Sequence, residues 1–225
     1  MTDWQGEPGV GGVFVQYGCG WTAPAEWLNF DASPTLRLER LPVVGRWCTR
    51  NPARFPDNVR YGDIVSGLPV ADGSVDGLFA SHVLEHLSRA DCDRALVNSY
   101  RMLKSGGVFR LVVPDLLLRA QRYVAAAEAG DSAACHSFMT DSGLGRETRP
   151  SGLVSRLVDA FGLSRHLWMW DEAGLRMVLE QHGFRRIRRC RTGDADHAAF
   201  ALVEQSGRFF DAVGRPELAL EAIRE

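Results

Sequence analysis

The sequence predicts an α/β fold: a single Rossmann-like, doubly wound, mostly parallel seven-stranded sheet with an insertion after the fifth strand. Two observations indicate this class. Short, mostly apolar and β-branched runs recur along the chain, and each ends at a glycine or a polar residue, as buried parallel strands do. The first run ends at Gly18 and Gly20 and the second at Asp31, a pairing with which open α/β sheets hold a nucleoside.

Each expected strand is justified by an apolar run that stops at a turn former or a charged residue. The glycines at the first stop tolerate positive φ and allow a ligand to approach the backbone, and Asp31 can accept hydrogen bonds from two ribose hydroxyls. The strands are expected at Val13–Tyr17, Trp27–Asp31, Val59–Gly62, Val75–Ser81, Val108–Val113, Phe184–Cys190 and Leu218–Ile223.

Two helices follow from apolar residues at helical spacing. Asp91–Lys104 is expected to be a crossover helix that stops at Ser105-Gly106-Gly107. A second helix begins after Asp171, a good N-cap residue, and ends at Gly183. Its buried face is formed by Leu175, Val178 and Leu179.

The connections depart from an ordinary doubly wound sheet in two places. Only Trp21–Glu26, interrupted by Pro24, separates the first two strands, so the usual first helix is expected to be missing or reduced to a turn. Leu116–Leu167 is much longer than a normal crossover and is expected to form a helix over Leu117–Ala129 and a lid that contributes to the acceptor pocket. The whole chain, 1–225, is predicted to form one domain.

The composition describes a soluble globular protein. Of the 225 residues, 45% are hydrophobic and 24% charged, which excludes disordered and fibrous classes. The net charge of −2 argues against a nucleic-acid partner, and five cysteines without a C-x-x-C pair fit a reducing compartment. With no leader-like or membrane-spanning segment, we expect a cytoplasmic protein with no membrane partner, and the oligomeric state stays open.

Five segments in fixed order carry a family resemblance. They are Tyr17-Gly18-Cys19-Gly20, Glu26–Asp31, Tyr61-Gly62-Asp63-Ile64, Ser74–Leu87 (which contains His82-Val83-Leu84-Glu85-His86) and Leu103–Asp115, with a weaker return at His166–Phe184. Together they resemble the class I S-adenosylmethionine-dependent methyltransferases, particularly the methyltransferase type 11-like group. The departures are Ser105, where a proline is common, and the short first crossover.

The resemblance implies S-adenosyl-L-methionine as the cofactor and a set of residues that bind it. Gly18, Cys19 and Gly20 would line the methionine moiety, Asp31 would hold the ribose hydroxyls, and Ser81 and His82 would border the sulfonium. The full implied set for the cofactor is Tyr17, Gly18, Cys19, Gly20, Asp31, Asp63, Ile64, Ser81 and His82, in which Asp63 and Ile64 meet the adenine.

Candidate catalytic residues are His166, Asp115 and His82, and each has a structural alternative. His166 could be a general base or could orient the helix that begins near Asp171. Asp115 could face the substrate or cap a helix. His82, Glu85 and His86 have a spacing like that of a metal-binding helix, but we expect Glu85 and His86 to cap a helix start, and we assign no metal.

Together these observations predict a methyltransferase that acts on a small-molecule acceptor by in-line methyl transfer. Two alternatives stay open: an NAD(P)-dependent oxidoreductase, because Gly18-x-Gly20-x-x-Ala23 with Glu39 fits a dinucleotide fingerprint, and a catalytically silent subunit that binds S-adenosylmethionine. The sequence also does not exclude transfer or cyclisation of another part of the cofactor. The acceptor atom, O, N or C, is not determined by the sequence.

Overall fold

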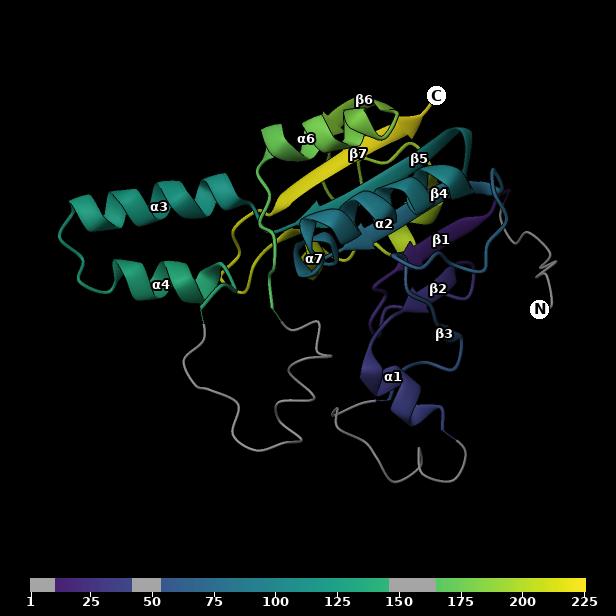
Figure 1. The fold of residues 1–225 in the computed structure, drawn as a ribbon, viewed down its shortest axis with the longest axis horizontal. Helices are drawn as coiled ribbons and strands as arrows, with labels where there is room; N and C mark the ends of the chain where they lie inside the picture. Colours follow the sequence, from purple (N-terminus) through teal and green to yellow (C-terminus); the bar gives the residue numbers. More distant parts are fainter. Residues whose placement is uncertain (1–10, 42–53, 146–164) are drawn as a thin grey trace.

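A seven-stranded sheet forms the centre of the protein, with strand order β3-β2-β1-β4-β5-β7-β6. The computed structural model describes residues 11–41, 54–145 and 165–225. Pairing is parallel from β3 to β5, whereas β7 runs antiparallel to both of its neighbours (Figure 1). This confirms the predicted fold class. The strands are β1 (Phe14–Tyr17), β2 (Leu28–Asp31), β3 (Val59–Tyr61), β4 (Val75–Ser81), β5 (Leu103–Val113), β6 (Phe184–Arg189) and β7 (Leu218–Arg224).

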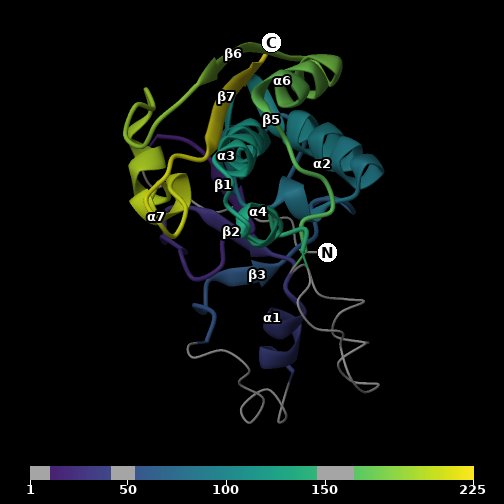
Figure 2. The same ribbon diagram turned by 90° about the vertical axis from the view of Figure 1, so that its left-hand side faces the viewer.

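Helices cover both faces of the sheet. Figure 2 shows α2 (Arg89–Met102) and α6 (Glu172–Gln181) on one face, and α7 (Ser206–Phe209) on the other. Side chains alternate along each strand, so that Val15 belongs to the core under α2 and α6, whereas Phe14 belongs to the opposite core. The remaining helices are α1 (Pro34–Glu39), η2 (Leu84–His86), α3 (Leu116–Glu128), α4 (Ala134–Asp141) and η3 (Ala198–Leu202).

The connection from β1 to β2 contains no helix, as the short spacing predicts. Two buried side-chain amides replace the hydrogen bonds that a helix would make. Gln16 donates to the Thr22 carbonyl at 2.7 Å, and Asn29 donates to the carbonyls of Pro24 and Trp27 at 2.9 and 2.8 Å. Residues of η3 and α7, from the C-terminal part of the chain, pack against this face of the sheet.

Some sequence predictions about element boundaries were wrong. The Ser105-Gly106-Gly107 segment does not stop a helix, because α2 ends at Met102 and β5 begins at Leu103 and runs through the glycines. The α2 helix begins two residues earlier than expected, since Ser88 caps it by accepting from the Asp91 amide. Strand β6 ends at Arg189 rather than at Cys190.

The insertion after β5 begins as a helical hairpin. Helices α3 and α4 lie side by side and extend beyond the end of the sheet (Figures 1 and 2). The sequence predicted α3 and missed α4. Residues 146–164, which hold most of the remaining expected lid, lie outside the described residues, so the lid stays a prediction. No helix in the described part of the chain is long and apolar enough to cross a membrane.

The arginines of β6 lie at the edge of the sheet and contact acidic residues or carbonyls of this same chain. In contrast to these edge arginines, one arginine of β5 is buried in the protein interior. The fully buried Arg110 of β5 pairs with Glu204 and Glu221, and donates to Asp194 at 2.8 Å and to the Arg191 carbonyl at 2.9 Å. This guanidinium ties β5 and β7 to the segment that covers the second face.

Replacing Arg110 by alanine should lower the free energy of unfolding by about 3–5 kcal/mol, because buried carboxylates lose their counter-charge. The matched control is Arg101→Ala, which breaks an exposed pair with Asp72 and should cost below about 1 kcal/mol. Urea denaturation measures both. Equal losses for the two variants would contradict the structural role given to Arg110.

Candidate cofactor and acceptor site

The ends of β1 and β2 are joined by the Asp31 carboxylate. One oxygen of Asp31 accepts from the Gly20 amide at 3.0 Å, and the other accepts from the Ser33 amide at 2.8 Å. The strand order places these ends at one edge of a parallel sheet, where ligands bind in open α/β folds. A carboxylate has about four acceptor positions, so after these two bonds about two remain for a diol.

The glycines after β1 have the left-handed backbone that the sequence led us to expect. Gly18 has φ +66° and Gly20 has φ +55°. A Cβ on Gly18 would lie 2.2 Å from Cγ2 of Val83, whereas a Cβ on Gly20 would meet no atom within 4 Å. Gly20 therefore leaves open space at the end of β1, and Gly18 lets the segment after β4 pack closely.

Four residues of the expected cofactor set direct their side chains away from this edge or into local turns. The Tyr17 hydroxyl lies 3.2 Å from Ser99 of α2, and burial raises the pKa of Tyr17. Cys19 is fully buried, and burial together with Asp31 raises its pKa to about 12. Ile64 lies in the core, and Asp63 accepts from Val65 and Ser66. Any contact with a ligand from Tyr17, Cys19 or Ile64 would therefore come from the backbone.

Arg208 of α7 belongs to this edge and was missed by the sequence interpretation. Its Nη2 donates to the Cys19 carbonyl at 2.5 Å, and its Nη1 is buried without a hydrogen-bond partner among the described residues. Burial lowers the pKa of Arg208, while Cys19 and Asp31 nearby counteract this effect. An arginine 189 positions after Cys19 offers no local spacing signal that could have identified it.

The end of β4 supplies two further polar residues. Ser81 is buried, and its Oγ has no hydrogen-bond partner in the described structure. His82 has φ 54°, a strained value for a residue that is not glycine, and its amide donates to the Val112 carbonyl at 2.9 Å. Strain of this kind is common at functional sites.

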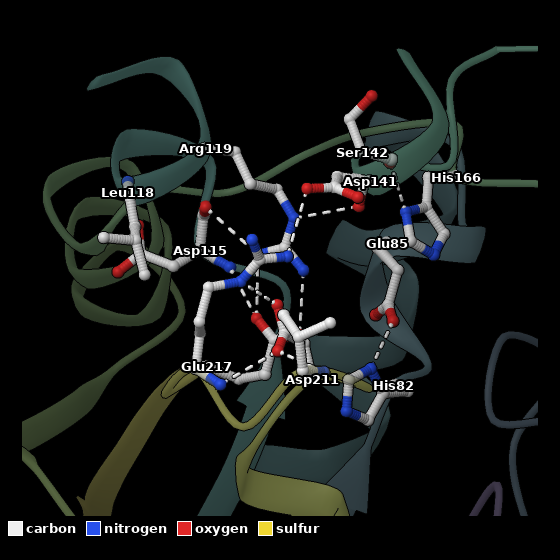
Figure 3. Close-up of polar contacts among 12 residues, drawn as sticks. His82, Glu85, Asp115, Leu118, Arg119, Asp141, Ser142, His166, Asp211 and Glu217 are labelled. Carbon is white, nitrogen blue, oxygen red and sulfur yellow. Dashed lines mark hydrogen bonds and ion pairs between the residues drawn. The ribbon is translucent and has the colours of Figure 1, made fainter. Parts of the chain in front are cut away.

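His82 is held between the β4 end and α7. Its Nε2 lies 3.1 Å from the Arg208 carbonyl, and its Nδ1 lies 3.3 Å from Oε1 of Glu85 (Figure 3). Burial opposes the charged form of His82, but the Glu85 carboxylate, the Arg208 carbonyl and Glu217 together outweigh this effect and raise the pKa of His82.

Glu85, His86 and His166 form a cluster beside His82. Each contributes a ligand-type atom, and these atoms lie within 4.8 Å of one another. The expectation that Glu85 and His86 cap a helix was wrong, because no side chain caps η2. His166 does not contact Asp171 in any hydrogen bond or ion pair of the described residues. Instead, its Nδ1 lies 2.6 Å from the Ser142 carbonyl, and burial lowers its pKa (Figure 3).

Asp115 makes the contacts of its structural alternative, the helix cap. Its Oδ1 accepts from the Leu118 amide at 3.1 Å at the start of α3. Its own amide donates to Glu217, which also accepts two bonds of 2.8 Å from Arg119 (Figure 3). Asp115 therefore fixes the root of the helical hairpin.

Trp168 and Trp170, which follow the Leu116–Leu167 segment, differ in their exposure to solvent. Trp168 is 44% exposed, whereas Trp170 is buried in the core under α2 and α6. Only Trp168 is accessible to an acceptor molecule in this structure.

A protein-family model matches the part of the chain that forms this edge of the sheet. Residues 15–111 match the family model described as "Methyltransferase domain", so the match begins in β1 and ends in β5. It includes Gly18, Gly20, Asp31, Ser81 and His82. No curated protein sequence matches the chain significantly.

Solved structures with a similar arrangement have low sequence identity. An S-adenosylmethionine-dependent methyltransferase from Methanosarcina mazei is 15% identical, with 94% of this chain and 91% of that chain covered and a TM-score of 0.49. A protein from Thermotoga maritima, described as a possible histamine N-methyltransferase, is 14% identical, with 96% and 83% covered and a TM-score of 0.47. An Archaeoglobus fulgidus methyltransferase is 15% identical, with 95% and 86% covered and a TM-score of 0.46.

The two glycines provide a matched pair of variants. Gly20→Ala should cost about 1–2 kcal/mol of unfolding free energy, the cost of a left-handed alanine. Gly18→Ala should cost a further 1–3 kcal/mol, roughly, because Val83 must also move. Chemical denaturation of the two variants gives the comparison, and the additional Val83→Ala change should reduce the cost at Gly18 only. Equal costs would show that Val83 does not press on Gly18.

Proposed function

We propose that this protein is an S-adenosylmethionine-dependent methyltransferase and that it acts on a small-molecule acceptor by in-line methyl transfer. The observation that carries the proposal is the Gly20 to Asp31 hydrogen bond at the sheet edge, which puts free acceptor positions of a carboxylate next to open backbone. When bound, the cofactor supplies a methyl group that is already activated as a sulfonium. The protein then contributes chiefly alignment and exclusion of water.

Different residues at this edge suit different parts of S-adenosylmethionine. Asp31 suits the ribose diol, and the unpartnered Nη1 of Arg208 suits a carboxylate such as that of a methionine moiety. The unpartnered Ser81 Oγ is a further polar group at the same edge. Proton removal, where the acceptor needs it, falls to His82 or His166, and the lowered pKa of His166 keeps it neutral near pH 7.

The oxidoreductase alternative is less consistent with the local backbone. A dinucleotide fingerprint needs a helix that opens at the glycines to face the pyrophosphate, and residues 18–27 contain none. Glu39, the acid of that fingerprint, is buried and accepts from the Phe55 amide at 3.0 Å. These findings favour the methyltransferase proposal.

The alternatives within the same cofactor class are separated by turnover. A silent binding subunit would bind S-adenosylhomocysteine. It would not convert S-adenosylmethionine to S-adenosylhomocysteine with any acceptor. An enzyme that transfers another part of the cofactor would instead release methylthioadenosine. Product analysis by mass spectrometry distinguishes both cases from methyl transfer, which releases S-adenosylhomocysteine.

Asp31→Ala should weaken S-adenosylhomocysteine binding by roughly 10- to 100-fold, because a hydrogen bond to a charged group contributes about 1.5–3 kcal/mol. Isothermal calorimetry measures the affinity. Asp57→Ala is the control, since the Asp57 side chain is fully exposed. An unchanged affinity in a folded Asp31→Ala protein would remove Asp31 from the site.

Arg208→Met should weaken S-adenosylhomocysteine binding by at least about 10-fold, the effect of losing one charged hydrogen bond. Methylthioadenosine, which has no carboxylate, should bind the variant and the wild type equally. This pair of ligands separates recognition of the carboxylate from the structural bond to Cys19. If both ligands lose affinity to the same extent, Arg208 acts only through the backbone of the glycine segment.

A further inference from the structure

Glu85 is a fully buried carboxylate that lacks hydrogen-bond partners. Its side chain has no solvent exposure, and neither oxygen accepts a hydrogen bond from any described residue. Only its backbone oxygen is engaged, by the amides of Leu167 and Trp168 at 2.6 and 3.2 Å. A buried carboxylate that accepts no hydrogen bond is unfavourable, even with the His82 ring nearby, and buried charges are normally hydrogen-bonded as well as paired, or coordinate a metal.

The histidines around Glu85 share one hydrogen-bond arrangement. Nδ1 of His86 lies 2.8 Å from the Arg165 carbonyl, and Nδ1 of His166 lies 2.6 Å from the Ser142 carbonyl. A carbonyl can only accept, so in both rings Nδ1 carries a proton, and in the neutral form of each ring Nε2 keeps a lone pair. A histidine that binds a metal usually donates its other ring N–H to a carbonyl or carboxylate in this way.

These lone pairs are directed into the same space as the Glu85 carboxylate. Nε2 of His86 lies 4.0 Å from Oε1 of Glu85, and the rings of His86 and His166 lie 4.9 Å apart. The ligand-type atoms of the three residues are within 4.8 Å of one another. Metal bonds of about 2.0–2.1 Å to nitrogen and 2.0–2.2 Å to oxygen require these atoms to close by roughly 1 Å, which side-chain rotation can supply.

We infer that Glu85, His86 and His166 bind a divalent transition-metal cation, for which Zn²⁺ is the best match. Two imidazoles and one carboxylate suit zinc and leave a fourth position open. The structure gives each ligand a fixed position: Glu85 and His86 follow β4 on η2, and His166 precedes α6 and is held by Ser142 at the end of α4. The site therefore joins the sheet edge to the helical hairpin.

A cation accounts for Glu85 better than the structural alternatives do. The helix cap that the sequence favoured is absent from η2. His82 approaches one Glu85 oxygen at 3.3 Å but does not meet hydrogen-bond geometry, and it leaves the other oxygen and two histidine lone pairs unmatched. One cation satisfies all three groups.

The open position would bind an acceptor oxygen and lower the pKa of a hydroxyl there, as a zinc-bound water is acidified. This part rests on the proposed function. His166, with both ring nitrogens engaged, would then be a ligand instead of a general base. Metal binding itself is measured without turnover, so the site and the methyltransferase proposal can fail separately.

The test uses the full chain freed of metal by a chelator, then titrated with Zn²⁺ by calorimetry and with Co²⁺ by absorption. The background carries Cys135→Ser and His136→Ala, which remove an exposed adjacent pair that could bind zinc adventitiously. We expect one Zn²⁺ per chain, and a Co²⁺ spectrum of a four-coordinate site without a thiolate charge-transfer band. The Co²⁺ spectrum therefore tests the type of ligand in the parent protein alone, without any variant of the three proposed ligands.

Three single variants then identify the ligands: Glu85→Gln, His86→Ala and His166→Ala. Each should weaken Zn²⁺ binding by at least tenfold and remove the rise in Tm that Zn²⁺ gives the parent protein. His197→Ala, a histidine outside the cluster, should change neither quantity. In the metal-free state Glu85→Gln should still unfold in one cooperative thermal transition, and this checks that the variant folds.

The proposal is overturned if the parent protein binds no Zn²⁺ stoichiometrically, if the Co²⁺ spectrum shows thiolate ligation, or if the three variants bind Zn²⁺ as the parent does. Binding that is lost in the three variants and kept in His197→Ala supports it.

Discussion

The hydrogen bond between the Gly20 amide and the Asp31 carboxylate is the contact on which the candidate site depends. It joins the ends of two parallel strands that no helix connects, so the glycine segment and the acid are fixed relative to each other. The positive φ of Gly18 lets Val83 pack against the same segment and brings the end of β4 to it. Changing this contact would therefore alter the position of the glycine segment relative to Asp31.

The missing first helix explains why distant residues take part. Because Gln16 and Asn29 satisfy the carbonyls of the β1 to β2 connection, the face of the sheet beside it is left for η3 and α7. Helix α7 brings Arg208 to the Cys19 carbonyl and to His82. The short connection between β1 and β2 is therefore accompanied by a charged residue of the site, Arg208, that comes from a distant part of the chain.

The sequence predicted the strands and the glycine and acid pair well, because these depend on local patterns of apolar residues and turn formers. It failed where a tertiary contact decides the outcome. Ser105–Gly107 was read as a helix stop, but Leu103 and Val108 on either side of it pair with β4, so this segment lies within β5 at a register shift. The tertiary contacts of Arg208 and the burial of Trp170 also have no local signal. For Glu85, spacing alone did not show that its carboxylate is fully buried and accepts no hydrogen bond from the described residues, and these are the observations on which the metal proposal rests.

A crystal structure with bound S-adenosylhomocysteine tests the central claim most directly, since it reads the position of the ligand rather than an affinity. The account predicts that the ribose hydroxyls lie within hydrogen-bond distance of Asp31 and that the carboxylate of the homocysteine part lies against Arg208. A ligand bound elsewhere, with Asp31 still bonded only to Gly20 and Ser33, would contradict it.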